Sequence, residues 1–227
     1  MELLKVLLAL GGDNVRADQL ADALWPNAEA DYAYKSFTAT LHRLRRMLDE
    51  DDALLLRDGR LSLSKSLVWA DTWALERLFD DFDAAMRGIE AKDADALRRK
   101  FTDRVLALYR GPFLPDESEQ PSYIACREQA RARMLRFATG VARGWEQVGA
   151  PDAAADVYLR LIDADELCEP LYRNLMQCFQ RNGAVIDALT TYERLRTILA
   201  TRLKTMPSPE TQSLYAALKS SRAAAAS

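Results

Sequence analysis

The sequence predicts a mainly α-helical protein in two parts. Three helices and a small β-hairpin come first, and an all-α domain of repeated helix pairs follows. Three observations support this fold class. Apolar residues recur at helical spacing along most of the 227 residues. Asp58 and Gly59 separate two short apolar runs, which is typical of a hairpin turn. The C-terminal half repeats itself with a period of 34 residues.

Helical periodicity in the first part predicts three helices, at residues 2–10, 17–24 and 32–48. Gly11 and Gly12 end the first helix, and Trp25 followed by Pro26 ends the second. The third helix is longer and amphipathic, with an apolar stripe that consists of Phe37, Leu41, Leu44 and Leu48. Two strands are expected at residues 53–57 and 60–63. This order of elements is that of a winged helix-turn-helix.

The third helix is basic on the face opposite its apolar stripe. Between Tyr32 and Leu48 the sequence holds no acidic residue, and an acidic block from Asp49 to Asp52 follows. A helix that enters the major groove of DNA needs small side chains at the base edges and long cations near the phosphates. The candidates for such contacts are Lys35, Thr38, Ala39, His42, Arg43, Arg45 and Arg46.

Several of these candidates have an alternative. Arg45 lies nearer the apolar stripe, so that a phosphate contact and an ion pair with the acidic block are both open. His42 either donates to a base or a phosphate or is an exposed polar residue. Arg57 and Arg60 place two cations beside the hairpin turn, where they either contact DNA or serve solubility. For the whole basic face, the alternative is a solvated helix surface.

The net charge of −3 argues against a chain that coats nucleic acid through bulk charge. The negative balance comes from residues 1–71, which hold nine Lys or Arg and twelve Asp or Glu, whereas the later residues hold twenty-two of each. Contact with nucleic acid therefore has to come from a local basic patch. The expected helix at residues 32–48 is the segment that the acidic residues avoid.

Ten residues of the first part together match a known pattern. They are Leu20, Ala21, Leu24, Trp25, His42, Arg43, Leu44, Arg45, Asp58 and Gly59. They resemble the DNA-binding domain of OmpR/PhoB-type regulators, in the version found in the antibiotic regulatory protein (SARP) and AfsR-like families. The resemblance covers residues 3–71 and implies that the hairpin tip reaches a minor groove or the phosphate backbone. That family has a small antiparallel sheet before the first helix. We therefore expect an N-terminally incomplete domain in the C-terminal part of a longer protein, and the alternative is that these strands are missing.

The remainder is expected to be helical, with helices at residues 73–87, 94–109, 122–148, 153–163, 169–182, 185–203 and 209–220. Within it, Gly149, Ala154, Tyr158 and Leu161 recur 34 residues later as Gly183, Ala188, Tyr192 and Leu195, and Val141 and Trp145 return as Leu175 and Phe179. This is the spacing of the tetratricopeptide (TPR) repeat, and the alternative is a chance likeness between amphipathic helices. Because TPR arrays bind partners on a concave surface, polar candidates for such a surface are Arg173, Asn174, Gln177 and Arg181.

Residues between 109 and 215 match a second known pattern. They are Tyr109, Gly111, Phe113, Leu114, Arg127, Glu128, Leu175, Met176, Gly183, Ala188, Leu189, Tyr192, Glu193, Arg194, Pro207, Ser208, Pro209, Glu210 and Tyr215. They resemble the bacterial transcriptional activator domain (BTAD), which follows the winged helix in SARP-type regulators. Tyr123 stands where that family typically has a Trp. The resulting division is a winged helix at residues 1–71, a TPR-like BTAD at 72–219 and a flexible tail at 220–227.

Enzymatic chemistry is not expected. His42 is the single histidine, and the chain has no phosphate-binding loop, no dinucleotide-binding motif and no catalytic triad. No cluster has metal-ligand spacing, so neither a metal nor a cofactor is predicted. Cys126, Cys168 and Cys178 are expected to be buried thiols. No apolar run reaches the length of a membrane span and no secretory signal is recognised, which makes the cytoplasm the expected compartment.

The sequence thus predicts a transcriptional regulator that binds double-stranded DNA, and an activator is preferred. Its helical domain is expected to serve regulation or oligomerisation of the protein. The resemblance implies contact with RNA polymerase and two protomers side by side on directly repeated sites. Two alternatives stay open. One is a TPR-like protein-interaction module whose winged helix does not bind DNA. The other is the output segment of a larger signalling ATPase of the AfsR-like kind.

Overall fold

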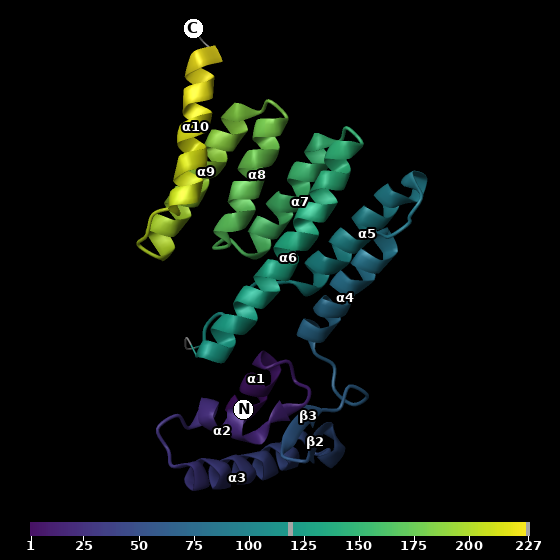
Figure 1. Ribbon diagram of the computed structural model, residues 1–227, viewed down its shortest axis with the longest axis vertical. Helices are drawn as coiled ribbons and strands as arrows, with labels where there is room; N and C mark the ends of the chain where they lie inside the picture. The colour runs from purple at the N-terminus through teal and green to yellow at the C-terminus, as the bar shows by residue number, and fades with distance from the viewer. Residues whose placement is uncertain (118–119, 226–227) are drawn as a thin grey trace. The chain divides into compact units, whose positions relative to one another are not determined.

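The computed structural model describes residues 1–117 and 120–225, with the side chains at 91, 92, 224 and 225 left out (Figure 1). Contacts between residues divide the chain into two compact units. The first consists of Met1–Ala74 and Phe113–Ala130, and the second of Leu75–Pro112 and Arg131–Ser227. The mainly α-helical fold class predicted above is confirmed. The domain boundary between residues 71 and 72 stays a prediction.

The first unit has the expected order of elements. Helices α1 (Glu2–Ala9), α2 (Ala17–Leu24) and α3 (Ala30–Leu48) precede the short 3-10 helix η1 (Asp51–Ala53) and the hairpin strands β2 (Leu54–Arg57) and β3 (Arg60–Leu63). The apolar faces of the three helices and the sheet close over one core, whose fully buried side chains include Leu3, Leu20, Phe37, Leu54 and Leu61.

The hairpin turn adopts the backbone that its two residues favour. Asp58 and Gly59 both have positive φ, at 48° and 69°, as a two-residue turn between twisted antiparallel strands requires. The strands pair in register, with Leu56 opposite Leu61 and Arg57 opposite Arg60. This prediction is therefore confirmed to within one residue.

A third strand was not predicted from the sequence. β1 (Val15–Arg16) pairs antiparallel with β3, so that the sheet has three strands in the order β1-β3-β2. A strand of two residues is too short to show the alternation of apolar and polar residues that identifies a strand in a sequence. In the structure, Val15 is buried and follows a sharp turn. In that turn Gly12 has a φ of +72°, and a Cβ there would lie 2.5 Å from the Trp73 ring, so that glycine is required twice over.

The buried face of α3 ends one turn before the apolar stripe that the sequence indicated. Phe37, Leu41 and Leu44 are buried as predicted, but Leu48 is 36% exposed. Leu48 is the last helical residue, and the chain turns at Asp49 into the left-handed region with a φ of 52°. Leu48 therefore has the helical position of a stripe residue, but no other part of the first unit packs over it.

Residues 113–130 belong to the first unit although they lie far along the sequence. Tyr123 is fully buried in the core of that unit, and Phe113 packs against it with ring centroids 6.0 Å apart. Arg127 holds the segment in shape, because its guanidinium donates to the carbonyls of Phe113, at 2.7 Å, and Leu114. Lys5 of α1 donates to Glu117 at 2.5 Å, and this hydrogen bond raises the pKa of Lys5.

The second unit is built from antiparallel helices, labelled α4 (Asp71–Met86), α5 (Ala91–Leu108), α6 (Pro121–Gln147), α7 (Pro151–Ala164), α8 (Glu169–Arg181), α9 (Val185–Arg202) and α10 (Pro209–Ala225). The first residues of α4 and of α6 belong to the first unit. Helices α7 to α10 lie side by side in sequence order (Figure 1). Because α10 continues to Ala225, most of the expected tail is helical, and residues 226 and 227 lie outside the described residues.

The 34-residue repeat corresponds to two helix pairs. Gly149 and Gly183 both end a helix with a positive φ, at 73° and 75°, and α7 and α9 begin 34 residues apart. The matched side chains Ala154 and Ala188 are both fully buried. Repeated helix pairs are therefore confirmed as the architecture of this part.

A buried ion pair closes the end of α7. Arg131 donates to both carboxylate oxygens of Asp165, at 2.7 and 2.9 Å, and the Tyr109 hydroxyl donates to the same carboxylate at 2.8 Å. Burial, together with the Asp165 charge, raises the pKa of Tyr109. Three segments of the second unit are tied together by this one carboxylate.

Candidate nucleic-acid interface

The outward face of α3 carries the residues that the sequence singled out. Lys35, Thr38, Ala39, His42, Arg43 and Arg46 are exposed, and Arg45 is half-buried. The side chains on the opposite face fix this orientation, because Ala33, Phe37, Leu41 and Leu44 are all buried. Successive residues on the exposed face follow one another at three- or four-residue spacing, so they line one stripe of the helix.

Two cations and the histidine on this face are free to bind a ligand. Among the residues that the structure describes, the side chains of Lys35, His42 and Arg46 have no hydrogen bond or ion pair with a protein group. Other cations of the first unit do form ion pairs, as Arg16 does with Asp18 and Lys65 with Asp13. The unpaired stripe is therefore a local positive surface on a chain whose net charge is −3.

Two members of the stripe bond within α3. Thr38 donates its hydroxyl to the carbonyl of Tyr34 at 3.0 Å, the usual back-bond of a helical threonine. Arg43 bends back so that Nε donates to the carbonyl of Ala39 at 3.3 Å. Because these bonds are exposed and local, a phosphate competes with them at little cost.

Arg45 has a structural contact that the sequence did not suggest. Its guanidinium donates from Nε and Nη2 to the carbonyl oxygen of Leu54, at 3.2 and 2.6 Å. This joins the last turn of α3 to the first residue of β2. No ion pair between Arg45 and Asp49–Asp52 is found among the described residues, and a phosphate contact has not been tested.

The wing carries two exposed arginines beside its turn. Arg57 and Arg60 occupy opposite positions on β2 and β3, as the strand register requires. Like charges placed directly opposite in a sheet are destabilising. Arg60 donates to the carbonyl of Asn14 at 3.1 Å, whereas the Arg57 side chain makes no such contact within the described part of the chain.

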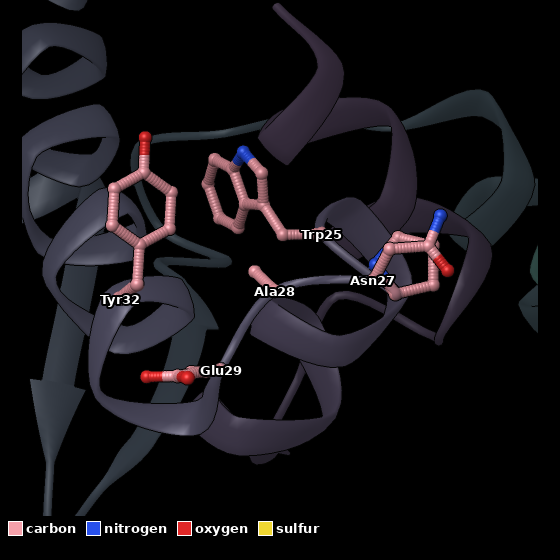
Figure 2. Close-up of a pocket in the computed structure, with 6 residues that line it drawn as sticks. Trp25, Asn27, Ala28, Glu29 and Tyr32 are labelled. Atoms are coloured by element: carbon pink, nitrogen blue, oxygen red, sulfur yellow. The ribbon is translucent and has the colours of Figure 1, made fainter.

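Tyr32 belongs to the same stripe of α3 and was not among the predicted residues. It lies three residues before Lys35, and the residue is 64% exposed. Figure 2 shows the rings of Tyr32 and Trp25 next to each other, with Ala28 beside Trp25, and these side chains line one open hollow at the connection between α2 and α3. The absence of acids from Tyr32 onward was the available signal, but an aromatic residue at a helix start reads equally well as core.

The four polar candidates on α8 are mostly occupied by contacts within the second unit. Arg173 approaches Ser208 and Thr211, and Asn174 donates to Thr139 at 3.2 Å. Arg181 forms an ion pair with Glu146 at 2.7 Å. Gln177 alone of the four is exposed without a hydrogen bond among the described residues. A partner-binding role for this set stays a prediction.

Two other kinds of site are absent from the described residues. They contain no group of His, Cys, Asp or Glu side chains that could hold a metal ion. None of the helices described here has the length and apolarity to cross a membrane. Cys168 and Cys178 are buried, and burial raises their pKa values to about 11 and 12, but Cys126 is only half-buried, contrary to expectation.

Comparisons with known proteins identify the family of the helical part. Residues 71–219 match the family model described as the bacterial transcriptional activator domain. The regulatory protein AfsR of Streptomyces griseus is 27% identical over 210 residues, which are 92% of this chain and 21% of that protein. The chain thus spans about a fifth of the length of this relative.

A solved structure shares the fold. Mycobacterium tuberculosis EmbR, in complex with a low affinity phosphopeptide, superposes with a TM-score of 0.55 at 23% identity, over 96% of this chain and 59% of that one. A likeness at this identity concerns the fold. The family match covers well over half of the chain, so the chain belongs to the bacterial transcriptional activator domain family and is a SARP-like regulator.

Proposed function

We propose that this protein is a transcriptional activator whose first unit binds double-stranded DNA. In this proposal the outward face of α3 lies in the major groove, where Ala39 and Thr38 are small enough to approach the base edges. Lys35 and Arg46 contact phosphates, and His42 donates to a base or a phosphate. Arg57 and Arg60 bring the wing to the neighbouring backbone or minor groove.

The observation that carries the proposal is the unpaired cationic stripe of α3. Among the described residues, Lys35, His42 and Arg46 form neither a hydrogen bond nor an ion pair with a protein group. A merely solvated helix surface would gain from nearby carboxylates, and this face has none between residues 32 and 48. The phosphates of a DNA ligand would supply the negative charges that this surface lacks.

The wider role in this proposal is supported by the family resemblance. As an activator, the protein would contact RNA polymerase, and two protomers would bind side by side on directly repeated sites. The match to about a fifth of AfsR also fits an output segment of a longer signalling protein in the cytoplasm. No cofactor and no catalytic residue enters this function.

The direct test is DNA binding by the whole chain, measured by fluorescence anisotropy with duplex DNA over a series of salt concentrations. We expect the affinity to fall steeply with salt. The variants K35A and R46A should each weaken binding and reduce the slope of log K against log salt by about one.

R87A is the matched control. Arg87 is an exposed cation at the end of α4 in the second unit, so its removal changes the net charge equally without touching the stripe. A chain that shows no salt-dependent affinity for duplex DNA would instead support the interaction-module alternative. Equal losses in K35A and R87A would contradict the assigned face.

A further inference from the structure

Helix α6 has two glycines in its C-terminal half, and the fold requires only one of them. A Cβ at Gly144 would collide with the guanidinium of Arg98, so the packing of α5 against α6 requires glycine there. Gly140 is exposed, and the atom nearest to a Cβ there would be a ring carbon of Phe82 at 3.9 Å, an ordinary van der Waals contact. Since glycine inside a helix is less stable than alanine, Gly140 lowers stability without a packing reason in this unit.

Two arginines without partners lie beside Gly140 on the same face of α6. Arg136 precedes it by four residues and Arg143 follows it by three, and all three residues are exposed. Neither arginine has a hydrogen bond or an ion pair among the described residues, whereas Arg133 of the same helix pairs with Glu76. We call Arg136, Gly140 and Arg143 the arginine stripe. It is a positive surface, and its centre lets another backbone come close.

The same chain exposes a segment of the opposite charge, at residues 47–52 of the first unit. Residues 49–52 are all acidic and exposed, and none of their carboxylates has a hydrogen bond or an ion pair within the described part of the chain. They follow the C-terminus of α3, where the helix dipole favours cations instead. Met47 and Leu48 beside them are 59% and 36% exposed. Unpaired carboxylates next to uncovered apolar side chains suit an interface with a cationic surface.

The arginine stripe suits a chain segment better than a small anion. Arg136 and Arg143 are about 10 Å apart along the helix axis, so one inorganic anion would not bridge them, whereas a segment with several carboxylates faces both. A second copy of the chain supplies such a segment in residues 47–52. The two complementary surfaces are unlike, so a contact between copies repeats in one direction and is not a symmetric pairing.

We propose that the arginine stripe of one copy binds residues 47–52 of a second copy, head to tail. Arg136 and Arg143 pair with carboxylates of the segment, and Met47 and Leu48 pack against the helix at Gly140. The contact depends on exposed charges, so it is weak in solution and is screened by salt. It adds contact residues to the side-by-side protomers of the proposed function. Because it needs no DNA, its failure leaves the proposal of DNA binding untouched.

Sedimentation equilibrium of the full chain without DNA measures this contact. We expect reversible association at high micromolar concentration and low ionic strength, and added salt should weaken it. The variants R136E/R143E and E50K/D51K/D52K should each lose the association at unchanged helical circular dichroism, because the contact then joins like charges. An equimolar mixture of the two variants should associate again, since each variant then meets a surface of opposite charge.

Two further variants separate the contact from net charge and from stability. R77E/R87E is the matched control, because Arg77 and Arg87 are exposed cations of the same unit outside the arginine stripe, and it should associate as the parent does. G140A should keep or raise the free energy of unfolding while it weakens association by about threefold or more.

Four results would overturn the proposal. They are a parent chain that stays monomeric, a mixture of the two charge-reversed variants that does not associate, an equal loss of association in R77E/R87E, and undiminished association of G140A. The third result would show that association follows net charge alone.

Discussion

Arg57 of β2 and Arg60 of β3 lie directly opposite each other at the tip of the wing. Such a pair opposes folding through like-charge repulsion. We therefore expect R57A to leave the free energy of unfolding unchanged or slightly raised, while it weakens DNA binding and lowers the salt slope by about one. Urea unfolding and salt-dependent anisotropy measure the two effects separately. A variant that loses stability and keeps its DNA affinity would assign Arg57 to the fold.

Neighbouring arginines at the end of α3 should behave in opposite ways. Arg45 donates two hydrogen bonds to the Leu54 carbonyl, so R45A should lower the free energy of unfolding by about 2 kcal/mol. Arg46 has no such contact, and R46A should stay within about 0.5 kcal/mol of the parent while DNA binding weakens. Similar unfolding curves for the two variants would show that the Arg45 contact contributes nothing to stability.

Ala39 lies on the exposed face of α3 where the helix would approach the base edges. The variant A39E should weaken DNA binding by about tenfold or more, because its carboxylate would face phosphates. Its melting temperature should hardly change, since the residue is exposed and glutamate is a good helix former. A39Q separates charge from bulk in the same assay. If A39E binds DNA as tightly as the parent, Ala39 does not lie at the interface.

Gly12 and Gly59 allow a comparison of backbone strain with and without a steric clash. Both have positive φ, but a Cβ at Gly12 would meet Trp73 whereas Gly59 faces open space. G59A should cost about 1–2 kcal/mol of stability, the ordinary cost of a left-handed alanine. G12A should cost more, because the Trp73 ring, which donates from Nε1 to the Gly11 carbonyl, must move. Equal losses of unfolding free energy for G12A and G59A in urea would mean that the Trp73 ring moves aside at no cost in stability.

Alkaline conditions should destabilise the second unit. Burial raises the pKa values of Cys168 to about 11 and Cys178 to about 12 from an ordinary value of 9.0. In the unfolded chain these thiols therefore lose their protons first, and the free energy of unfolding falls as the pH rises from about 9 towards 11. C178A should show a smaller fall between pH 7.5 and pH 10. Stability that is flat over this range would contradict the burial of these thiols.

Much of the fold could be predicted from local pattern. The order of helices, the turn at Asp58 and Gly59 and the helix pairs are set by periodicity and by residues with special backbone preferences. β1 was not predicted because a strand of two residues is too short to show an alternation of apolar and polar residues. Leu48 was placed in the core because periodicity does not show where the covering structure ends.

The candidate site shows the same division. The exposed face of α3 follows from the apolar stripe behind it, and the unpaired state of Lys35 and Arg46 agrees with the lack of nearby acids in the sequence. The contact between Arg45 and Leu54 was out of reach, because it joins a side chain to a backbone carbonyl across a turn.

Tyr123 sits in the core of the first unit, yet it comes after 38 residues that belong to the second. The chain therefore passes from one unit to the other three times, and no single cut separates them cleanly. A fragment that stopped at Ala74 would lack a fully buried aromatic side chain and would fold poorly or aggregate. Any recombination that joins this DNA-binding unit to a new effector module therefore has to carry the segment 113–130 with it, so the two units are expected to be inherited as a pair.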